Sequence, residues 1–214
     1  MIREAKKSGV PVTCETGPHY LVLCDEDLQE DGRFKMNPPL RSRSDREALL
    51  EGVADGTVDV IATDHAPHTM EEKELGFLDA PNGIIGLECA YGVCHKVLVD
   101  GGFNSDERLI ELMSTGPAEL MGHDKTDITA VLDDYADAVP GDDATKRVLD
   151  LGRVPESDQV DLVVLNTGEE WTVDPEKFHS SARNTPFGGW QVTGRPRATI
   201  IGSKLAFSRI DKED

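Results

Sequence analysis

The sequence predicts an α/β fold with parallel strands, and three observations support this class. Residues 58–63 form a short β-branched and apolar run, which is typical of a strand buried on both faces of a parallel sheet. Residues 10–14 have a similar composition and are also followed by acidic, glycine, proline and histidine residues. Between these strands, residues 46–54 have helical patterning. A strand, a helix and a strand in this order predict a βαβ unit with a right-handed crossover.

The elements before the second strand are short. Residues 1–8 are predicted to form a helix of about two turns, which cannot hold itself together alone. Residues 35–41 are predicted to be extended, because their consecutive prolines exclude a helix. Ser44 and Asp45 are predicted to cap the helix at 46–54, since their side chains accept hydrogen bonds from first-turn N–H groups.

After the second strand the sequence predicts a loop, then helices, then a small β layer. The loop covers residues 69–83 and is rich in glutamate. Helices are predicted at residues 84–99, at 106–113 after a Ser105 cap, and at 117–121. Four short strands are predicted near the end of the chain, at residues 161–165, 171–173, 191–192 and 198–201.

The composition is strongly acidic, with 41 acidic and 22 basic residues and a net charge of −19. Such a surface repels nucleic acid and anionic membranes, so we expect neither as a partner. Ordinary acidic solubility and adaptation to a salt-rich cytoplasm both remain open as explanations. The first residues lack the apolar segment of a signal peptide, and the four cysteines lack the spacing of a zinc site. These features predict a cytoplasmic protein with free thiols.

Polar residues cluster where the strand at 58–63 ends. Asp64, His65 and His68 follow that strand, and Pro67 blocks its continuation. The carboxyl ends of parallel strands are where α/β barrels hold their catalytic residues. Asp64 could bind a divalent metal through one oxygen and take a proton from the metal-bound water with the other. The alternative interpretation is a polar turn in which Asp64 caps the next helix.

Other candidates lie near the first predicted strand. Glu15 and His19 follow that strand and could point to the same end of the sheet. Asn37 lies in an extended segment and could bind a substrate amide, although asparagine before proline is also common in turns. A hydrolytic zinc site needs three or four nitrogen or oxygen ligands, and spacing alone identifies only Asp64 as a strong one.

Five motifs occur in order along the chain. They are VTCETGPHYL at 12–21, KMNPPLR at 35–41, IATDHAPHT at 61–69, the run from EEK to GLE at 71–88, and NTPFGGW at 184–190. Together they resemble the dihydroorotase family. Dihydroorotases are cyclic amidohydrolases of the amidohydrolase superfamily that interconvert N-carbamoyl-aspartate and dihydroorotate in pyrimidine synthesis. The match covers residues 1–121 and roughly 151–208.

The resemblance implies roles for the residues that match these motifs. Asp64 would be the catalytic aspartate of barrel strand 8, which ligates the more exposed zinc and shuttles the proton. His68 would bind the carboxylate of the substrate, and Asn37 would bind its pyrimidine ring. The zinc-activated hydroxide would attack the cyclic amide.

Four more residues take implied positions around that site. Asn82 and Gly83 would contact the substrate through their backbone, although Asn82 stands where a bulkier apolar residue is expected. Glu15 and His19 would lie beside the metals without being regular ligands. Zn²⁺ is the implied cofactor, with one or two ions in the complete enzyme.

Several parts of the family pattern have no counterpart in this sequence. These are the His-x-His of strand 1, the bridging carboxylated lysine or aspartate of strand 4, and the histidines of strands 5 and 6. The chain therefore resembles the C-terminal half of a dihydroorotase. We expect the last two βα units and terminal helices of a (β/α)8 TIM-type barrel at 1–121, an acidic insertion at 122–150, and a C-terminal β-sandwich portion at 151–214.

An incomplete barrel exposes sheet edges and apolar surface, which predicts association. We expect a homo-oligomer or a complex with the missing N-terminal half, and no activity from the isolated chain. A non-catalytic scaffold for aspartate transcarbamoylase is one alternative. A relative of the allantoinases or dihydropyrimidinases is another.

Overall fold

The computed structural model describes residues 1–123, 161–202 and 204–209 and contains both helices and strands, as expected for the α/β class. Contacts between Cα atoms divide the chain into two compact units. Unit 1 comprises Met1–Met121 and Glu170–Thr193, and unit 2 comprises Gly122–Glu169 and Gly194–Asp214. Most of the predicted acidic insertion lies outside the described residues. The division at 121 and 150 therefore stays a prediction.

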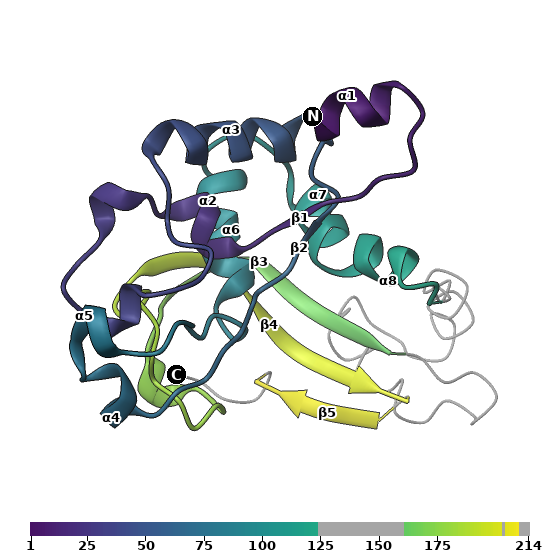
Figure 1. Ribbon diagram of the computed structural model, residues 1–214. Coiled ribbons are helices and arrows are strands. Elements are labelled where there is room, and N and C mark those ends of the chain that lie inside the picture. The colour runs from purple at the N-terminus through teal and green to yellow at the C-terminus, as the bar shows by residue number, and fades with distance from the viewer. Residues whose placement is uncertain (124–160, 203, 210–214) are drawn as a thin grey trace. The chain divides into compact units, whose positions relative to one another are not determined.

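Two strands of unit 1 pair in parallel, as predicted. They are β1 (Glu15–Thr16) and β2 (Val60–Ile61), with Glu15 opposite Val60 and Thr16 opposite Ile61 (Figure 1). Both are shorter than predicted, and the expected buried strand at 10–14 is wrong, since Val10 is 51% exposed. The N–H of Cys14 donates to the Asp59 carboxylate at 2.8 Å. Just before β1, this N–H therefore bonds to a side chain instead of to the backbone carbonyl of a neighbouring strand.

Helix α3 (Arg43–Ala54) connects the two strands. It begins three residues before the predicted start, because the cap is Ser42 rather than Ser44. The Asp45 N–H donates to Ser42 Oγ at 3.3 Å, and the Ser42 N–H donates to the Asp45 carboxylate at 3.1 Å. This reciprocal pair is a capping box, and it explains why Asp45 lies inside the helix.

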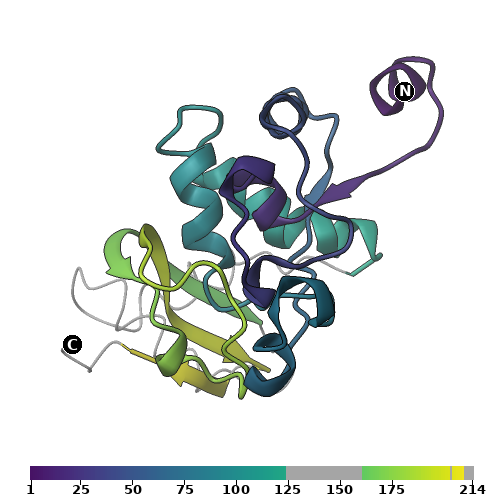
Figure 2. The ribbon, with the colours of Figure 1, turned by 60° about the vertical axis from the view of Figure 1, so that its left-hand side comes forward.

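Helix α1 (Ile2–Lys7) confirms the predicted first helix, and none of its residues is buried. Figure 2 shows it standing off from the rest of unit 1 at the end of an extended segment. Two ion pairs of 2.6 Å connect it to the segment around β2, from Arg3 to Asp55 and from Lys6 to Asp59. Apolar burial therefore contributes little to the stability of α1. A helix of this length is also not expected to be stable alone.

Unit 1 also contains short helical turns, most of them in segments for which the sequence predicts no helix. These are α2 (Pro18–Val22), the 3₁₀ turns Asp25–Asp27 and Gly32–Phe34, α4 (Met70–Lys73), α5 (Gly76–Asp79) and the 3₁₀ turn Pro175–Lys177. Each covers five residues or fewer, so tertiary packing stabilises it more than helix propensity does.

Helix α6 (Ala90–Leu98) begins six residues after the predicted start at Ile84. Ile84 instead forms a parallel bridge with His65, and the Ile85 N–H donates to the Asn184 carbonyl at 3.0 Å. An apolar run that is buried as extended chain cannot be distinguished from a buried helix by periodicity alone. The structure therefore corrects this prediction.

The helices after α6 lie close to their predicted places. Helix α7 (Asp106–Ile110) has the predicted Ser105 cap, whose Oγ accepts the Arg108 N–H at 3.3 Å. A π-helical turn (Glu111–Thr115) and α8 (Gly116–Leu120) follow it. Among the described residues, no helix is long and apolar enough to cross a membrane.

Two apolar clusters form the core of unit 1, and α6 contributes to both. The first contains Cys94 and Leu98 of α6, together with Leu21, Leu50, Val53, Val58, Ile61, Leu109 and Leu112. The second contains Cys89 and Val93, together with Leu23, Met36, Leu40, Ile84, Val173, Phe187 and Val192. All four cysteines are free thiols, and burial raises the pKa of Cys89 to about 12.

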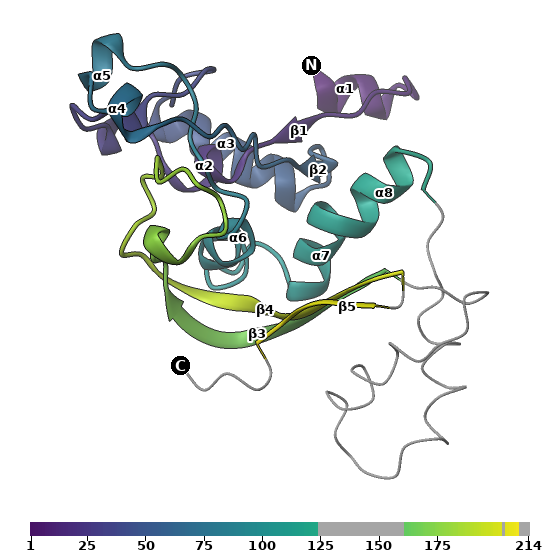
Figure 3. The same cartoon turned by 90° about the horizontal axis from the view of Figure 1, so that it is seen from below.

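A second sheet has the strand order β3-β4-β5, with β3 (Leu162–Thr172), β4 (Gln191–Ile201) and β5 (Lys204–Ser208) (Figure 3). Strands β4 and β5 are antiparallel. Four short strands were expected from the sequence, but β3 and β4 each join two of them into one. Within β3, Asn166 Oδ1 accepts the Gly168 N–H at 3.2 Å.

Candidate functional site

Asp64 follows β2 at the point where the chain leaves the sheet. The last ladder bond runs from the Ala62 N–H to the Thr16 carbonyl at 2.9 Å. In the described part of the chain, Asp64 is the one residue other than glycine with a positive φ, at 49°. Aspartate tolerates this left-handed conformation better than most residues, at a cost of about 1 kcal/mol or more. The strain is local, and Asp64 is exposed.

His19, in α2, is 2% exposed. Its ring lies against Gly17, where a Cβ would come within 2.6 Å of His19 Cε1. Burial lowers the pKa of His19 to about 4, against an opposing effect of the Asp64 charge. The Nε2 atom is buried and has no hydrogen-bond partner among the described residues. His19 is therefore a neutral imidazole with an unused nitrogen.

This burial predicts a pH-dependent stability. The pKa of His19 falls from 6.5 in the unfolded chain to about 4 in the fold, so the unfolded chain binds more protons between these values. The contribution of neutral His19 to stability is complete above pH 6.5 and is lost as the pH falls towards 4, at about 1.4 kcal/mol per pH unit. The free energy of unfolding, measured with urea across this pH range, should fall more steeply with decreasing pH for the wild type than for His19→Gln. Equal slopes would contradict the prediction.

Tyr20 connects α2 to the segment that carries Asn37. Its hydroxyl donates to the Pro38 carbonyl at 2.7 Å. Burial, together with the Asp64 charge, raises the pKa of Tyr20 to about 12, so this hydroxyl stays protonated as a donor. The Asn37 side chain is exposed immediately before Pro38, where it is free to meet a ligand from solution.

His65 stabilises the turn after β2 and has no ligand-binding role in this arrangement. Its Nδ1 accepts the backbone N–H groups of Gly86 and Leu87 at 3.4 and 3.3 Å. Accepting both bonds requires Nδ1 to be unprotonated. The side chain therefore anchors the segment before α6 to the end of β2, which is a structural role.

His68, Asn82 and Gly83 are brought together by the fold, as the resemblance implies. His68 Nε2 lies 2.9 Å from the Asn82 carbonyl, and Nδ1 lies 3.5 Å from the Glu72 carboxylate. Gly83 has a φ of 127°, and a Cβ there would approach His68 Nε2 to 3.0 Å and the Ala66 Cβ to 2.7 Å. Only glycine fits this close approach.

Two residues without an assigned role hold this group in place. Lys73 is 3% exposed, and its ammonium donates to the carbonyls of Pro81 and Gly83 at 2.8 and 2.7 Å. Asn184 is fully buried, and its amide group contacts both the turn after β2 and Gly83. Both residues lie in motifs that carried the resemblance, which was the one available signal for them.

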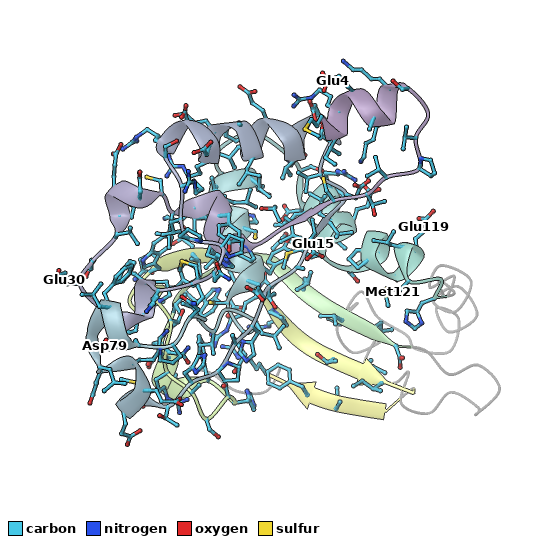
Figure 4. All side chains as sticks on the ribbon, in the orientation of Figure 1. Glu4, Glu15, Glu30, Asp79, Glu119 and Met121 are labelled. Atoms are coloured by element: carbon cyan, nitrogen blue, oxygen red, sulfur yellow. The ribbon has the colours of Figure 1, made fainter. Side chains whose placement is uncertain are left out.

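Glu15 lies apart from this group. It is an exposed residue of β1 opposite Val60, and Figure 4 labels it on the extended chain between α1 and α2. The site residues thus form two sets. Asp64 acts electrostatically on His19, while His68 contacts Asn82 and Gly83 directly.

The described residues do not form a metal site by themselves. They contain no group of three or more histidine, cysteine, aspartate or glutamate side chains placed to hold an ion. The exposed Asp64 carboxylate and the unused Nε2 of His19 are two candidate donor atoms, and a zinc ion in a protein takes three or four. A complete metal centre would therefore need further ligands.

No protein-family profile matches the chain. Curated relatives include a dihydroorotase from Geobacillus sp. (strain WCH70), 40% identical over 210 residues, and one from Brevibacillus brevis, 41% identical over 212 residues. The alignments cover 98% of this chain but only 43% and 44% of those proteins. The chain thus spans less than half of the length of these relatives, and the predicted resemblance to dihydroorotases is confirmed.

Solved structures give a related result. An L-hydantoinase (dihydropyrimidinase) from Arthrobacter aurescens superposes with a TM-score of 0.72 at 30% identity, and a D-hydantoinase from Thermus sp. with 0.71 at 25% identity. Each match covers 97% of this chain and 42% of the other protein. The fold is thus shared with part of these enzymes.

Proposed function

Since this chain is homologous to dihydroorotases over 98% of its length, we propose that it forms part of the active site of a cyclic amide hydrolase. The reaction is the interconversion of N-carbamoyl-aspartate and dihydroorotate in pyrimidine synthesis in the cytoplasm. The observation that carries this proposal is Asp64, a strained and exposed carboxylate at the carboxyl end of a parallel strand, beside a buried neutral imidazole. Polar residues at such strand ends perform the chemistry of α/β enzymes.

The fold supports a shared site. Strands β1 and β2 form a two-stranded parallel sheet, and in the proposed assembly they are strands 7 and 8 of a (β/α)8 barrel. Parallel sheets of two strands with both edges open are rarely stable alone. The remaining strands would come from the part of the protein that the curated relatives have and this chain lacks. The β-sandwich portion at 151–214 remains part of this proposal.

Each candidate site residue named below has a role in the proposed reaction. As a water oxygen bonds to the amide carbon, Asp64 accepts the proton of that water. It then delivers the proton to the ring nitrogen as the C–N bond breaks. His68 binds the substrate carboxylate, and Asn37 binds the ring amide. The backbone of Asn82 and Gly83 supplies further contacts.

We propose zinc as the metal of the complete enzyme, with Asp64 as the ligand from this chain and His19 and Glu15 beside it. The residues that the structure describes do not complete that site. The isolated chain should therefore bind at most one ion, weakly, and should not turn over substrate.

Complementation tests the proposal. Dihydroorotate hydrolysis and metal content would be measured for the purified chain, alone and after mixing with the N-terminal half of a curated relative. We expect hydrolysis and stoichiometric zinc only in the mixture. Turnover by the chain alone would overturn the shared site. A mixture that associates but stays inactive on every cyclic amide would favour a non-catalytic scaffold, for which aspartate transcarbamoylase is the partner to test.

A second candidate substrate class comes from the solved structures, which are hydantoinases or dihydropyrimidinases. Hydantoin and dihydrouracil, unlike dihydroorotate, carry no carboxylate on the ring. The same mixture would be assayed with dihydroorotate, dihydrouracil, hydantoin and allantoin. We expect a preference for dihydroorotate, because Nδ1 of His68 faces the exposed Glu72 carboxylate and, once protonated, would donate to a substrate carboxylate at the same place. A preference for dihydrouracil or hydantoin would assign the chain to the second class.

A further inference from the structure

We propose that Lys73 and Asn184 are positioning residues that clamp residues 81–83 against residues 66–68 and thereby direct the His68 ring. The clamp itself follows from contacts within unit 1. Its effect on substrate binding rests on the proposed function. Neither residue touches a ligand in this proposal, and both act through His68.

Lys73 forms one side of the clamp. Its ammonium donates to the carbonyls of Pro81 at 2.8 Å and Gly83 at 2.7 Å, and it lies 3.5 Å from the Lys35 carbonyl. The first two carbonyls flank Asn82. A buried ammonium is costly unless hydrogen bonds satisfy it, and burial lowers the pKa of Lys73. Its position in the interior therefore depends on these carbonyls, and their orientation depends on Lys73.

Asn184 forms the other side. Its Nδ2 donates to the carbonyls of Ala66 at 3.1 Å and Gly83 at 3.2 Å, and its Oδ1 accepts the His68 N–H at 3.1 Å. One side chain thus joins the turn after β2 to the Gly83 segment. The Gly83 carbonyl accepts from both Lys73 and Asn184, so it is the common point of the two sides.

The clamp acts on the ring of His68. Lys73 and Asn184 hold the carbonyls of Pro81 and Gly83, the residues on either side of Asn82, and the Asn82 carbonyl lies 2.9 Å from His68 Nε2. A carbonyl only accepts, so the proton of the ring stays on Nε2. Nδ1 then faces the exposed Glu72 carboxylate, 3.5 Å away. A substrate carboxylate that replaces Glu72 accepts a hydrogen bond from Nδ1, so it binds the ring in its doubly protonated, cationic form, with Nε2 still donating to the Asn82 carbonyl. Gly83 permits this close approach, because a Cβ there would overlap Ala66 and crowd His68 Nε2.

The tautomer of His68 is a direct readout, because a merely structural role of Lys73 would not change it in a folded variant. Long-range ¹H–¹⁵N spectra of the histidine rings would be recorded on the full chain, with His68→Gln identifying the signals. We expect the Nε2-protonated form in the wild type and in Lys73→Arg. We expect a mixture of tautomers in Lys73→Met.

Two further variants complete the test. Asn184→Asp keeps the acceptor for the His68 N–H but removes the two donors, so it should also give mixed tautomers if Lys73→Met does not fold. Lys96→Met is the matched control, because Lys96 also donates to a carbonyl, that of Gln191 at 3.1 Å, but away from the clamp. A neutral His68 protonated at Nδ1 alone in the wild type, or an unchanged tautomer in folded Lys73→Met and Asn184→Asp, would overturn the proposal.

Kinetics of the complemented enzyme separate this inference from the proposed function. Lys73→Met should raise KM for dihydroorotate about tenfold with kcat nearly unchanged, since uniform binding is lost rather than proton transfer. A clamp seen in the spectra of a protein that hydrolyses no cyclic amide would leave the inference standing and remove the proposed function. An unchanged KM in an active enzyme with mixed tautomers would show that the clamp does not serve substrate binding.

Discussion

Replacement of Asp64 by asparagine should lower kcat/KM for dihydroorotate by about 10³-fold or more in the complemented enzyme, because the group that carries the proton is lost. Asparagine is the best choice for this test, since it tolerates the positive φ of 49° that residue 64 adopts. The fold should therefore survive. Steady-state hydrolysis and metal content, measured together, would check the prediction.

Controls for this variant come from exposed carboxylates of the same unit. Asp79→Asn changes charge by the same amount at the end of α5 and should leave activity within about twofold. Glu15→Gln tests whether the β1 carboxylate matters, and we expect a smaller loss than for Asp64→Asn. An Asp64→Asn enzyme with activity near the wild type would show that proton transfer uses another group.

Replacement of Phe187 by alanine should destabilise the chain by about 3–5 kcal/mol, because a large side chain leaves a well-packed core. Phe187 is 1% exposed, packs in the second apolar cluster with Ile84, and meets the Trp190 ring edge-on at a centroid distance of 5.3 Å. It also anchors the segment that carries Asn184. Urea unfolding followed by tryptophan fluorescence and circular dichroism would measure the loss.

Phe103→Ala is the matched control, since Phe103 is 42% exposed. It should cost about 1 kcal/mol or less, as most surface substitutions do. Similar losses for Phe103→Ala and Phe187→Ala would contradict the assignment of Phe187 to the core. A fall in the m-value instead of the midpoint would mean that the transition is no longer two-state.

The parallel pairing of β1 with β2 and the place of Asp64 could both be predicted from the sequence. A β-branched run followed by Asp-His and a proline is a local signal, because strand burial and strand termination depend on neighbouring residues. The α7 cap at Ser105 followed in the same way. The start of α3 was three residues off, because two serines near Asp45 offer alternative caps.

The burial of His19 and the ends of α6 depended on packing that no local pattern contains. The residues around His19 do not indicate that its ring fits over Gly17, which happens once α2 packs on the core. Ile84 continues a helical pattern, yet its backbone pairs with His65. In both cases a contact with a separate segment outweighs local propensity.

The sequence by itself determined the class of the fold, the parallel strand pair, the exposed aspartate at its end and the relatedness to dihydroorotases, since all four depend on residue types in contiguous motifs. Only the tertiary structure decided which groups hold the site. In the sequence, Lys73 is only one charged residue among several glutamates. Asn184 contacts Ala66, which lies 118 positions away in the chain. The buried hydrogen bonds of Lys73 and Asn184 form only after folding removes competing water. The clamp can therefore be identified only from the tertiary structure.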